Sequence, residues 1–247
     1  MNILAIKAES EEYIKAAEEL SEKLAIDMSN NESDYILLVG NDGLSLKSCK
    51  NKNQKPIRVD FKSQELSYRQ KHGGRSKEQI AKAVGISQGV RPSIVDVTAG
   101  LGKDGFILAS LGCKVTMLER TPIVHALLED GLKRAEDITK NITLYQADSI
   151  KWLESCSYSP EVIYMDPMFP SRKKSAAIKK EMRIFHDIVG EDLDSTKLLK
   201  IALEKALYRV VVKRPKLSSP IGQIEPTISH EQKSCRFDIY VKKSLKK

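Results

Sequence analysis

The stretch from Ser93 to Gly105 constrains the fold of this chain more than any other. It reads Ser-Ile-Val-Asp-Val-Thr-Ala-Gly-Leu-Gly-Lys-Asp-Gly. Ile94, Val95 and Val97 form a β-branched run typical of a buried parallel strand, and the glycines after it allow a sharp turn. Residues 106–111 then read as an opening helix. A strand, a glycine-rich turn and a helix N-terminus present backbone N–H groups around a small site, which suits an anionic or polar cofactor.

The spacing of Gly100, Gly102 and Gly105 matches G-x-G-x-x-G, a pattern that several nucleotide-binding folds share. The pattern alone does not identify the cofactor. Asp96 lies just before the turn, where its carboxylate could accept a hydrogen bond from the ammonium group of a ligand or from a loop N–H. A turn that binds a diphosphate does not need a carboxylate at this place, so Asp96 argues against a dinucleotide. The plainer alternative is a glycine loop that only connects strand to helix.

The balance of charge points toward nucleic acid. The 247 residues include 41 Lys and Arg against 33 Asp and Glu, a formal net charge of +8, which is frequent in proteins that bind nucleic acid. A solvated basic surface without a partner is the alternative. The chain has no apolar run of the roughly 20 residues that span a bilayer and no signal region, so we expect a cytoplasmic protein without a membrane partner.

No metal site is expected either. The four cysteines stand far apart, with no spacing typical of zinc ligands or of a disulfide framework: Cys49, Cys113, Cys156 and Cys235.

The residues before the glycine turn read as a small α/β unit. Apolar residues at helical spacing predict a helix over Glu9–Ala25. The strand candidates are Asn2–Ile6, Tyr35–Val39, Leu44–Leu46 and Ile57–Phe61, with a hairpin turn at 41–43.

A basic stretch with an aromatic residue and two glycines follows this unit. Tyr68, Arg69 and Arg75 are the residues expected to contact RNA, because cations bind phosphate and an aromatic ring stacks on a base. The alternative is a solvated loop that leads into a helix from Lys77 to Val84.

Two further strands end in acidic residues. Glu119, next to Arg120, follows a strand over 114–118, and Asp148, next to Ser149, follows a strand over 142–145. Ligands bind at the carboxyl ends of parallel strands, so Glu119 is placed to accept hydrogen bonds from ribose hydroxyls and Asp148 from an adenine amino group. Either acid could instead only cap a helix. Between them, Thr121 and Pro122 are a typical N-cap and first residue of a helix that extends to about residue 137.

The strand predicted over 162–165 runs into Asp166-Pro167-Met168-Phe169-Pro170. In such a stiff loop, the carboxylate and the Pro167 carbonyl can accept hydrogen bonds from an exocyclic amino group while Phe169 stacks on the ring. The alternative is a rigid turn whose Asp caps the next helix. Three cations that could bind a phosphate backbone follow at once: Arg172, Lys173 and Lys174.

The rest of the chain continues the alternation of helices and strands. Helices are predicted over 176–189 and 193–207, strands over 208–212 and 236–241, and loops over 218–234. This pattern predicts three parts: a small N-terminal α/β unit (1–65), a basic connector with a helix (66–92) and a cofactor-binding domain (93–247).

Six motifs carry a resemblance to one family. They are Asp-x-Thr-Ala-Gly-Leu-Gly-x-Asp, Met-Leu-Glu-Arg, Asp-Pro-Met-Phe-Pro, Lys-Lys-Glu-Met-Arg, Val-Val-Val-Lys-Arg-Pro and Arg-Phe-Asp-Ile-Tyr. In this order they resemble the J-type methyltransferases of bacterial small-subunit (16S) ribosomal RNA, over nearly the whole chain from about residue 59. The resemblance implies a Rossmann-like fold, with a mostly parallel seven-stranded sheet and an antiparallel last strand. It also implies transfer of a methyl group from S-adenosylmethionine to guanine N2.

The resemblance further implies which residues line the cofactor site. These are Lys103 with Asp104, Glu119 with Arg120, Asp148 with Ser149, and Asp166, beside the turn formed by Asp96, Gly100 and Gly102. Asp166, Pro167 and Phe169 are the expected catalytic residues, with Asp166 either taking the proton or only accepting a hydrogen bond. The alternatives are an adenine-N6 or cytosine-N4 nucleic-acid methyltransferase, a nicotinamide-dependent oxidoreductase, and a non-catalytic RNA-binding protein.

Overall fold

The computed structural model describes residues 4–28, 33–50, 54–64, 66, 79–168 and 193–245. These residues form two compact units. One gathers the described residues within Met1–Asp60 and Thr121–Arg134, and the other gathers those within Phe61–Arg120, Ala135–Met168 and Asp192–Lys247. The three-part division of the sequence at residues 65 and 92 stays a prediction.

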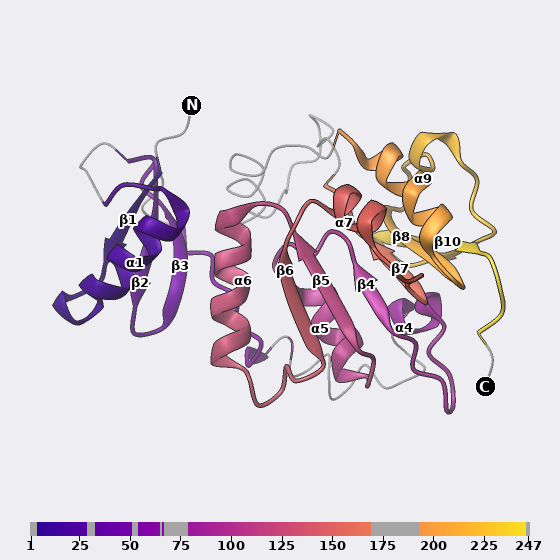
Figure 1. The fold of residues 1–247 in the computed structure, drawn as a ribbon, viewed down its shortest axis with the longest axis horizontal. Helices are drawn as coiled ribbons and strands as arrows, with labels where there is room; N and C mark the ends of the chain where they lie inside the picture. The colour runs from indigo at the N-terminus through magenta and orange to yellow at the C-terminus, as the bar shows by residue number, and fades with distance from the viewer. Residues whose placement is uncertain are drawn as a thin grey trace. The chain divides into compact units, whose positions relative to one another are not determined.

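The first unit is built on a three-stranded sheet in the order β1-β2-β3 (Figure 1). β1 (Leu4–Ala8) pairs in parallel with β2 (Tyr35–Gly40), and β2 pairs antiparallel with β3 (Gly43–Ser48) across the predicted hairpin turn. The short 3-10 helix η1 (Glu11–Tyr13) and the helix α1 (Ile14–Leu24) connect β1 to β2, as a parallel pair requires.

The strand predicted over Ile57–Phe61 is wrong. Ile57 makes one isolated antiparallel bridge to Leu46, and residues 58–62 form no strand. Ile57, Val59 and Phe61 are nevertheless all buried. Every second residue is therefore buried, as in a strand with one face in the core, although the backbone is irregular there.

A helix from the middle of the sequence completes the first unit. α6 (Pro122–Arg134) begins at Pro122, as predicted, and packs on β3. Gly131 permits a close approach, because a Cβ at that position would lie 2.4 Å from Cγ1 of Val59. The Arg134 guanidinium donates a hydrogen bond to the Val59 carbonyl at the end of the same helix.

The second unit contains a seven-stranded sheet in the order β6-β5-β4-β7-β8-β10-β9. Its strands are β4 (Ile94–Asp96), β5 (Val115–Glu119), β6 (Ile142–Gln146), β7 (Val162–Met165), β8 (Arg209–Pro215), β9 (Ile228–Glu231) and β10 (Cys235–Val241). β4 to β8 pair in parallel, and β10 pairs antiparallel with both β8 and β9. This sheet confirms the predicted α/β fold class.

The central strands are apolar on both faces. All four residues of β7 are buried, as are the three valines at 210–212 of β8, which is typical of parallel strands covered on two sides. β9 is different, because its Ile-Ser-His-Glu sequence is largely exposed. Because β9 has no apolar run, the sequence predicts loops over 218–234, where the structure has this strand.

Helices flank the sheet of the second unit: α4 (Gln79–Val84), α5 (Lys103–Ser110), α7 (Ser149–Ser155), α9 (Ser195–Lys205) and the 3-10 helix η2 (Ile221–Gln223). The steps from β4 to β5 and from β6 to β7 run in opposite directions across the sheet, so right-handed crossovers put α5 and α7 on opposite faces. α7, which the sequence did not predict, packs beside α9. The helix predicted over 176–189 lies outside the described residues.

None of the helices that the structure describes combines the length and the apolar character needed to cross a membrane.

Candidate active site

The glycine turn after β4 lies at the carboxyl edge of the sheet. Gly100 and Gly102 have φ angles of 53° and 71°, in the left-handed region that other residues rarely adopt. Among the described residues, the atom nearest to a Cβ built on Gly100 is the Thr98 carbonyl oxygen, at 4.0 Å. α5 begins at Lys103, whose side chain is exposed, and Gly102 provides no side-chain cap for the first N–H groups of this helix.

Asp96 ends β4 beneath this turn and is only 2% exposed. Its Oδ1 accepts the Thr98 N–H at 3.1 Å, so a loop N–H is its partner, as the sequence offered. Burial raises the pKa of Asp96 to about 8, because a buried carboxylate is poorly solvated. The carboxylates of Asp104 and Asp166 act in the same direction, whereas the Thr98 N–H lowers the pKa. The side chain is therefore largely protonated at neutral pH.

Glu119 ends β5 and faces the same turn. It is 7% exposed, and its Oε2 accepts the Gly100 N–H at 3.0 Å. This bond connects the acidic residue of β5 to the glycine turn of β4 and fixes the direction of the carboxylate. Arg120, the next residue, forms an ion pair in which its Nη1 lies 2.8 Å from Oδ2 of the partly exposed Asp194.

Asp148 and Ser149 both have structural partners. Asp148 is the N-cap of α7 and accepts the Lys151 N–H on Oδ1 at 3.0 Å, so the helix cap offered as an alternative is present. The buried Ser149 hydroxyl donates to the Val97 carbonyl at 2.6 Å. This bond holds the start of α7 against the end of β4.

Asp166 follows β7 directly and stands beside the glycine turn. Its backbone N–H donates to Oγ1 of Thr98 at 2.6 Å, and its Oδ2 lies 2.8 Å from Nζ of Lys213. Pro167, the next residue, is buried. The structure therefore brings the two strongest sequence motifs, which begin at Asp96 and Asp166, into one site through the Thr98 hydroxyl.

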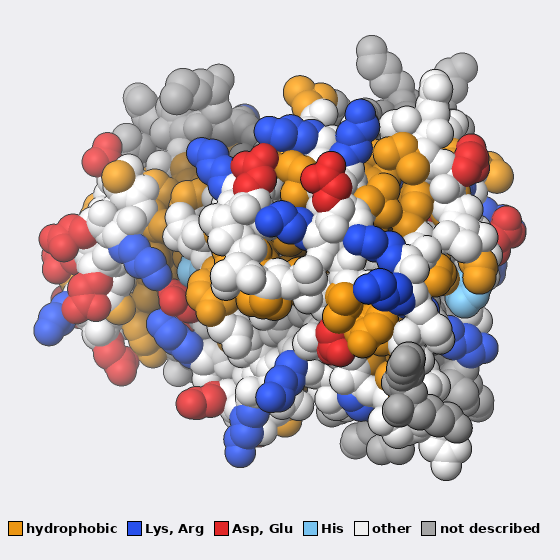
Figure 2. Space-filling model, turned by 45° about the vertical axis from the view of Figure 1, so that its right-hand side comes forward, with side chains coloured by type: hydrophobic (Ala, Val, Ile, Leu, Met, Phe, Trp, Pro, Cys, Tyr) orange, Lys and Arg blue, Asp and Glu red, His pale blue; other side chains and the backbone are white. Residues whose placement is uncertain are grey.

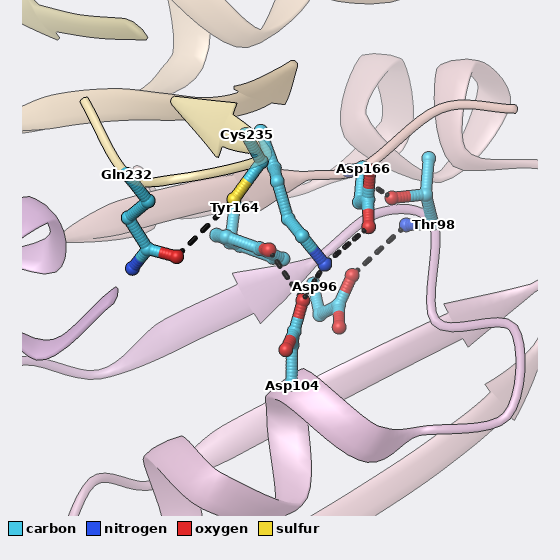
Figure 3. A network of polar contacts seen from close by, with 8 residues as sticks. Asp96, Thr98, Asp104, Tyr164, Asp166, Gln232 and Cys235 are labelled. Carbon is cyan, nitrogen blue, oxygen red and sulfur yellow. Dashed lines mark hydrogen bonds and ion pairs between the residues drawn. The ribbon is translucent and has the colours of Figure 1, made fainter. Parts of the chain in front are cut away.

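Lys213 is the residue of this site that sequence reasoning missed. Its ammonium lies 2.7 Å from Oδ2 of Asp104 as well as 2.8 Å from Asp166, and the Tyr164 hydroxyl donates to the same Asp104 oxygen at 2.7 Å (Figure 3). The only sequence signal was its place near the end of a predicted strand, within Val-Val-Val-Lys-Arg-Pro. A lysine at such a place is more often solvated.

Lys213 is charged and Tyr164 is neutral in this network. Although burial lowers the pKa of Lys213, the carboxylates of Asp166 and Asp104 raise it above its ordinary value. Burial, and then the Asp104 carboxylate, raise the pKa of the Tyr164 phenol well above its ordinary value. Within the network, Tyr164 therefore donates a hydrogen bond and Lys213 supplies positive charge.

The other predicted site residues lie outside the described residues: Phe169, Tyr68, Arg69, Arg75, Arg172, Lys173 and Lys174. Over the part of the chain that the structure describes, no group of three or more His, Cys, Asp and Glu side chains could hold a metal ion.

Comparison with known proteins identifies the family. The family described as "Putative SAM-dependent methyltransferase" matches residues 19–242. A Ribosomal RNA small subunit methyltransferase J from Pseudomonas fluorescens is 46% identical, over 95% of this chain and 93% of the relative. The chain belongs to this methyltransferase family. It is an enzyme that uses S-adenosylmethionine as methyl donor.

Further relatives agree with this assignment. The protein of the same name from Ectopseudomonas mendocina is 48% identical to the enzyme over 87% of this chain and 85% of the relative. The crystal structure of a SAM-dependent methyltransferase from Neisseria gonorrhoeae has 34% identity and a TM-score of 0.74, and the match covers 96% of this chain and 95% of that one.

The residues at the carboxyl edge fit S-adenosylmethionine. The described residues leave open the space beyond Gly100, the N-terminus of α5 follows the turn, and the buried carboxyl groups of Asp96 and Glu119 lie beneath and beside it. Carboxylate oxygens and backbone N–H groups are the partners that ribose hydroxyls, an α-ammonium and an α-carboxylate require. When bound, this cofactor supplies an electrophilic methyl group on a sulfonium.

Proposed function

We propose that the enzyme methylates the exocyclic N2 of a guanine in small-subunit (16S) ribosomal RNA, with the RNA or the small subunit as partner in the cytoplasm. The printed name of the relatives supports the substrate class. The observation that carries the chemistry is the placement of Asp166, whose backbone is bound to Thr98 and whose carboxylate meets Lys213 beside the glycine turn.

The cofactor would be held by the residues that the resemblance implies. Glu119 would accept the ribose hydroxyls, since its carboxylate is already directed at the turn by the Gly100 N–H. Asp148 would reach adenine with the oxygen that does not cap α7. Ser149 would contribute its backbone, because its hydroxyl donates to the Val97 carbonyl. The other members of the proposed set are Asp96, Gly102, Lys103, Asp104, Arg120 and Asp166.

Asp166 would act on the guanine amine. The lone pair of this amine is delocalised into the ring, so the amine is a poor nucleophile. A carboxylate at Asp166 and the Pro167 carbonyl would accept its two hydrogens and aim the nitrogen at the methyl carbon, while Phe169 stacks on the base. The donor would supply the methyl group at the expense of its C–S bond, whose electron pair would stay on sulfur. The methylated amine would lose one proton, to Asp166 or to water.

The RNA would be bound through phosphates and through an unstacked base, which costs a few kcal/mol to extract. On the face shown in Figure 2, the described Lys and Arg side chains are interspersed with acidic ones. The proposed RNA contacts are those predicted from the sequence: Tyr68, Arg69, Arg75, Arg172, Lys173 and Lys174.

Mass spectrometry of nucleosides from small-subunit RNA tests the proposal. A strain without this enzyme should lose N2-methylguanosine at one position, and the wild-type gene, but not one with Asp166→Asn, should restore it. Loss of N6-methyladenosine or N4-methylcytidine instead would favour the other amino-methyltransferases. An unchanged nucleoside profile would favour a protein that only binds RNA.

A further inference from the structure

Three carboxyl groups converge at the carboxyl edge of the central strands. Asp96 ends β4, Asp104 lies in the first turn of α5, and Asp166 follows β7. The ammonium of Lys213 contacts two of them, at 2.7 Å from Asp104 and 2.8 Å from Asp166. The side chains of Lys213 and Asp104 are only 28% and 17% exposed, so solvent screens this contact weakly.

The sheet register explains why Lys213 reaches both carboxylates. β7 and β8 are parallel neighbours in which Met165 pairs with Val212. The next residues along the chain are Asp166, directly after β7, and Lys213, which is still within β8 and pairs with Phe237 of β10, so the two residues lie at the same level. Asp104, on the helix that follows the glycine turn, contacts the same ammonium.

We propose that Lys213 is a positioning residue for methyl transfer, whose ammonium keeps the Asp166 carboxylate ionised and directed at the acceptor amine while it connects Asp166 to the cofactor-side helix α5. This inference rests on the proposed function, in which Asp166 accepts hydrogens from the amine. A nearby cation favours the ionised form of a carboxylate, which is the form that accepts two hydrogen bonds.

Further groups hold the two residues that the ammonium contacts. The Tyr164 hydroxyl donates to the Asp104 carboxylate, and the Thr98 hydroxyl accepts the backbone N–H of Asp166. The other titratable groups of the described residues that act on this network are Asp96 and Cys235, and both disfavour a negative charge on Asp166 when they are ionised.

The test compares Lys213→Met with Lys213→Arg. The matched control is Lys216→Met, because Lys216 forms a surface ion pair with Glu231 at 2.9 Å, just beyond the same strand. Methyl transfer to small subunits from the deletion strain is measured as kcat between pH 5.5 and 9 at saturating S-adenosylmethionine. Calorimetry with S-adenosylhomocysteine reports cofactor affinity and shows that each variant is folded. Lys213→Gln replaces Lys213→Met if the latter does not fold.

For Lys213→Met we expect kcat at pH 7 to fall about 100-fold, the scale of losing one preorganised electrostatic partner. The acid limb of the profile should move to higher pH, because the carboxylate is protonated more easily without the cation. Affinity for S-adenosylhomocysteine should stay within about threefold of wild type, because the variant is expected to affect turnover and not cofactor binding. Lys213→Arg should keep the wild-type acid limb, and Lys216→Met the full wild-type profile.

Two results would overturn the inference: an unchanged kcat and acid limb in Lys213→Met, or a loss confined to cofactor affinity. Asp166→Asn in the same assay separates this failure from failure of the proposed function. If Asp166→Asn is inactive and Lys213→Met is normal, only the inference fails. If Asp166→Asn transfers methyl at the wild-type rate, the catalytic assignment itself fails.

Discussion

Two aspartates end neighbouring strands of the same sheet, yet their surroundings differ. Asp96, the last residue of β4, is almost fully buried, accepts a backbone N–H, and has a pKa raised to about 8. Asp166, after β7, has a side chain that is 38% exposed and meets the Lys213 ammonium at 2.8 Å. One carboxyl group is thus kept neutral by burial, and the other is placed beside a cation that favours its charge.

The difference separates two tasks at one edge. The buried Asp96, whose pKa is raised, adds little negative charge beneath the glycine turn. Asp166, beside the Lys213 ammonium, is placed for its proposed role of accepting hydrogens from an amine. The Thr98 N–H donates to the Asp96 carboxyl group, and the Thr98 hydroxyl accepts from the Asp166 N–H. One residue therefore fixes the positions of the two aspartates relative to each other.

The largest expected effect comes from Asp166→Asn. The amide keeps the shape of the side chain but loses the negative charge and one acceptor, so kcat should fall about 1,000-fold, within the range of acid–base and electrostatic groups. A tritium-methyl transfer assay measures the loss, and calorimetry should show near wild-type binding of S-adenosylhomocysteine. Glu231→Gln, at the surface, is the control. Equal loss of cofactor affinity and turnover would erase the distinction between the two aspartates.

Asp96→Asn tests the neutral side of the comparison. The folded pKa of about 8 lies above the ordinary value of 3.8, so the folded protein keeps a proton that the unfolded chain releases. This contribution to stability is complete below pH 3.8 and is lost as the pH rises toward 8, at about 1.4 kcal/mol per pH unit. The asparagine variant should lack this slope, and urea unfolding at pH 5, 6.5 and 8 measures it. Parallel pH curves for the two proteins would contradict a protonated Asp96.

Glu119→Gln tests whether the cofactor side is separate from catalysis. A hydrogen bond to a charged group contributes about 1.5–3 kcal/mol, so affinity for S-adenosylhomocysteine should fall roughly 10- to 100-fold while kcat at saturation stays near wild type. Glu161→Gln is the matched control, because Glu161 also accepts a backbone N–H, that of Ser93, at 2.6 Å. Wild-type affinity in calorimetry would remove Glu119 from the ribose site.

The smallest effect is expected from Gly100→Ala. The left-handed backbone should cost about 1 kcal/mol in unfolding free energy, and the new methyl group should also reduce cofactor affinity because it points into the open space of the turn. Gly89 has a φ of 78° and, over the part of the chain that the structure describes, no atom within 4 Å of its Cβ position, so Gly89→Ala should show only the loss of stability. Thermal unfolding and calorimetry distinguish the two outcomes.

The sequence predicted the sheet well because central parallel strands are continuous apolar runs. The runs at 162–165 and 210–212 could hardly form anything else in this context. Prediction failed where residues are buried without forming strand hydrogen bonds, and where a strand forms these bonds without being buried. The run from Ile57 is buried without a ladder, and β9 has a ladder without being buried. These errors have one cause, because apolar spacing reports burial only.

The part of the candidate site that could be predicted is the set of acidic residues at the carboxyl ends of strands. Asp96, Glu119 and Asp166 are all acids that end or directly follow strands, and the structure gathers the three around the glycine turn. Lys213 escaped prediction because its partners are distant in sequence: Asp104 is 109 residues away and Asp166 is 47. Only the pairing of β7 with β8 reveals that this lysine faces carboxylates and not water.

The packing of α6 on β3 has a consequence for synthesis of the chain. The helix that packs on β3 ends at Arg134, whereas β3 ends at Ser48. When β3 has just emerged from the ribosome, α6 has not yet been synthesised. The nascent chain therefore lacks the helix against which β3 packs. We expect the three-stranded sheet that contains β3 to mature only after β4, α5, β5 and α6 have been synthesised, so a unit whose strands are made early is completed late.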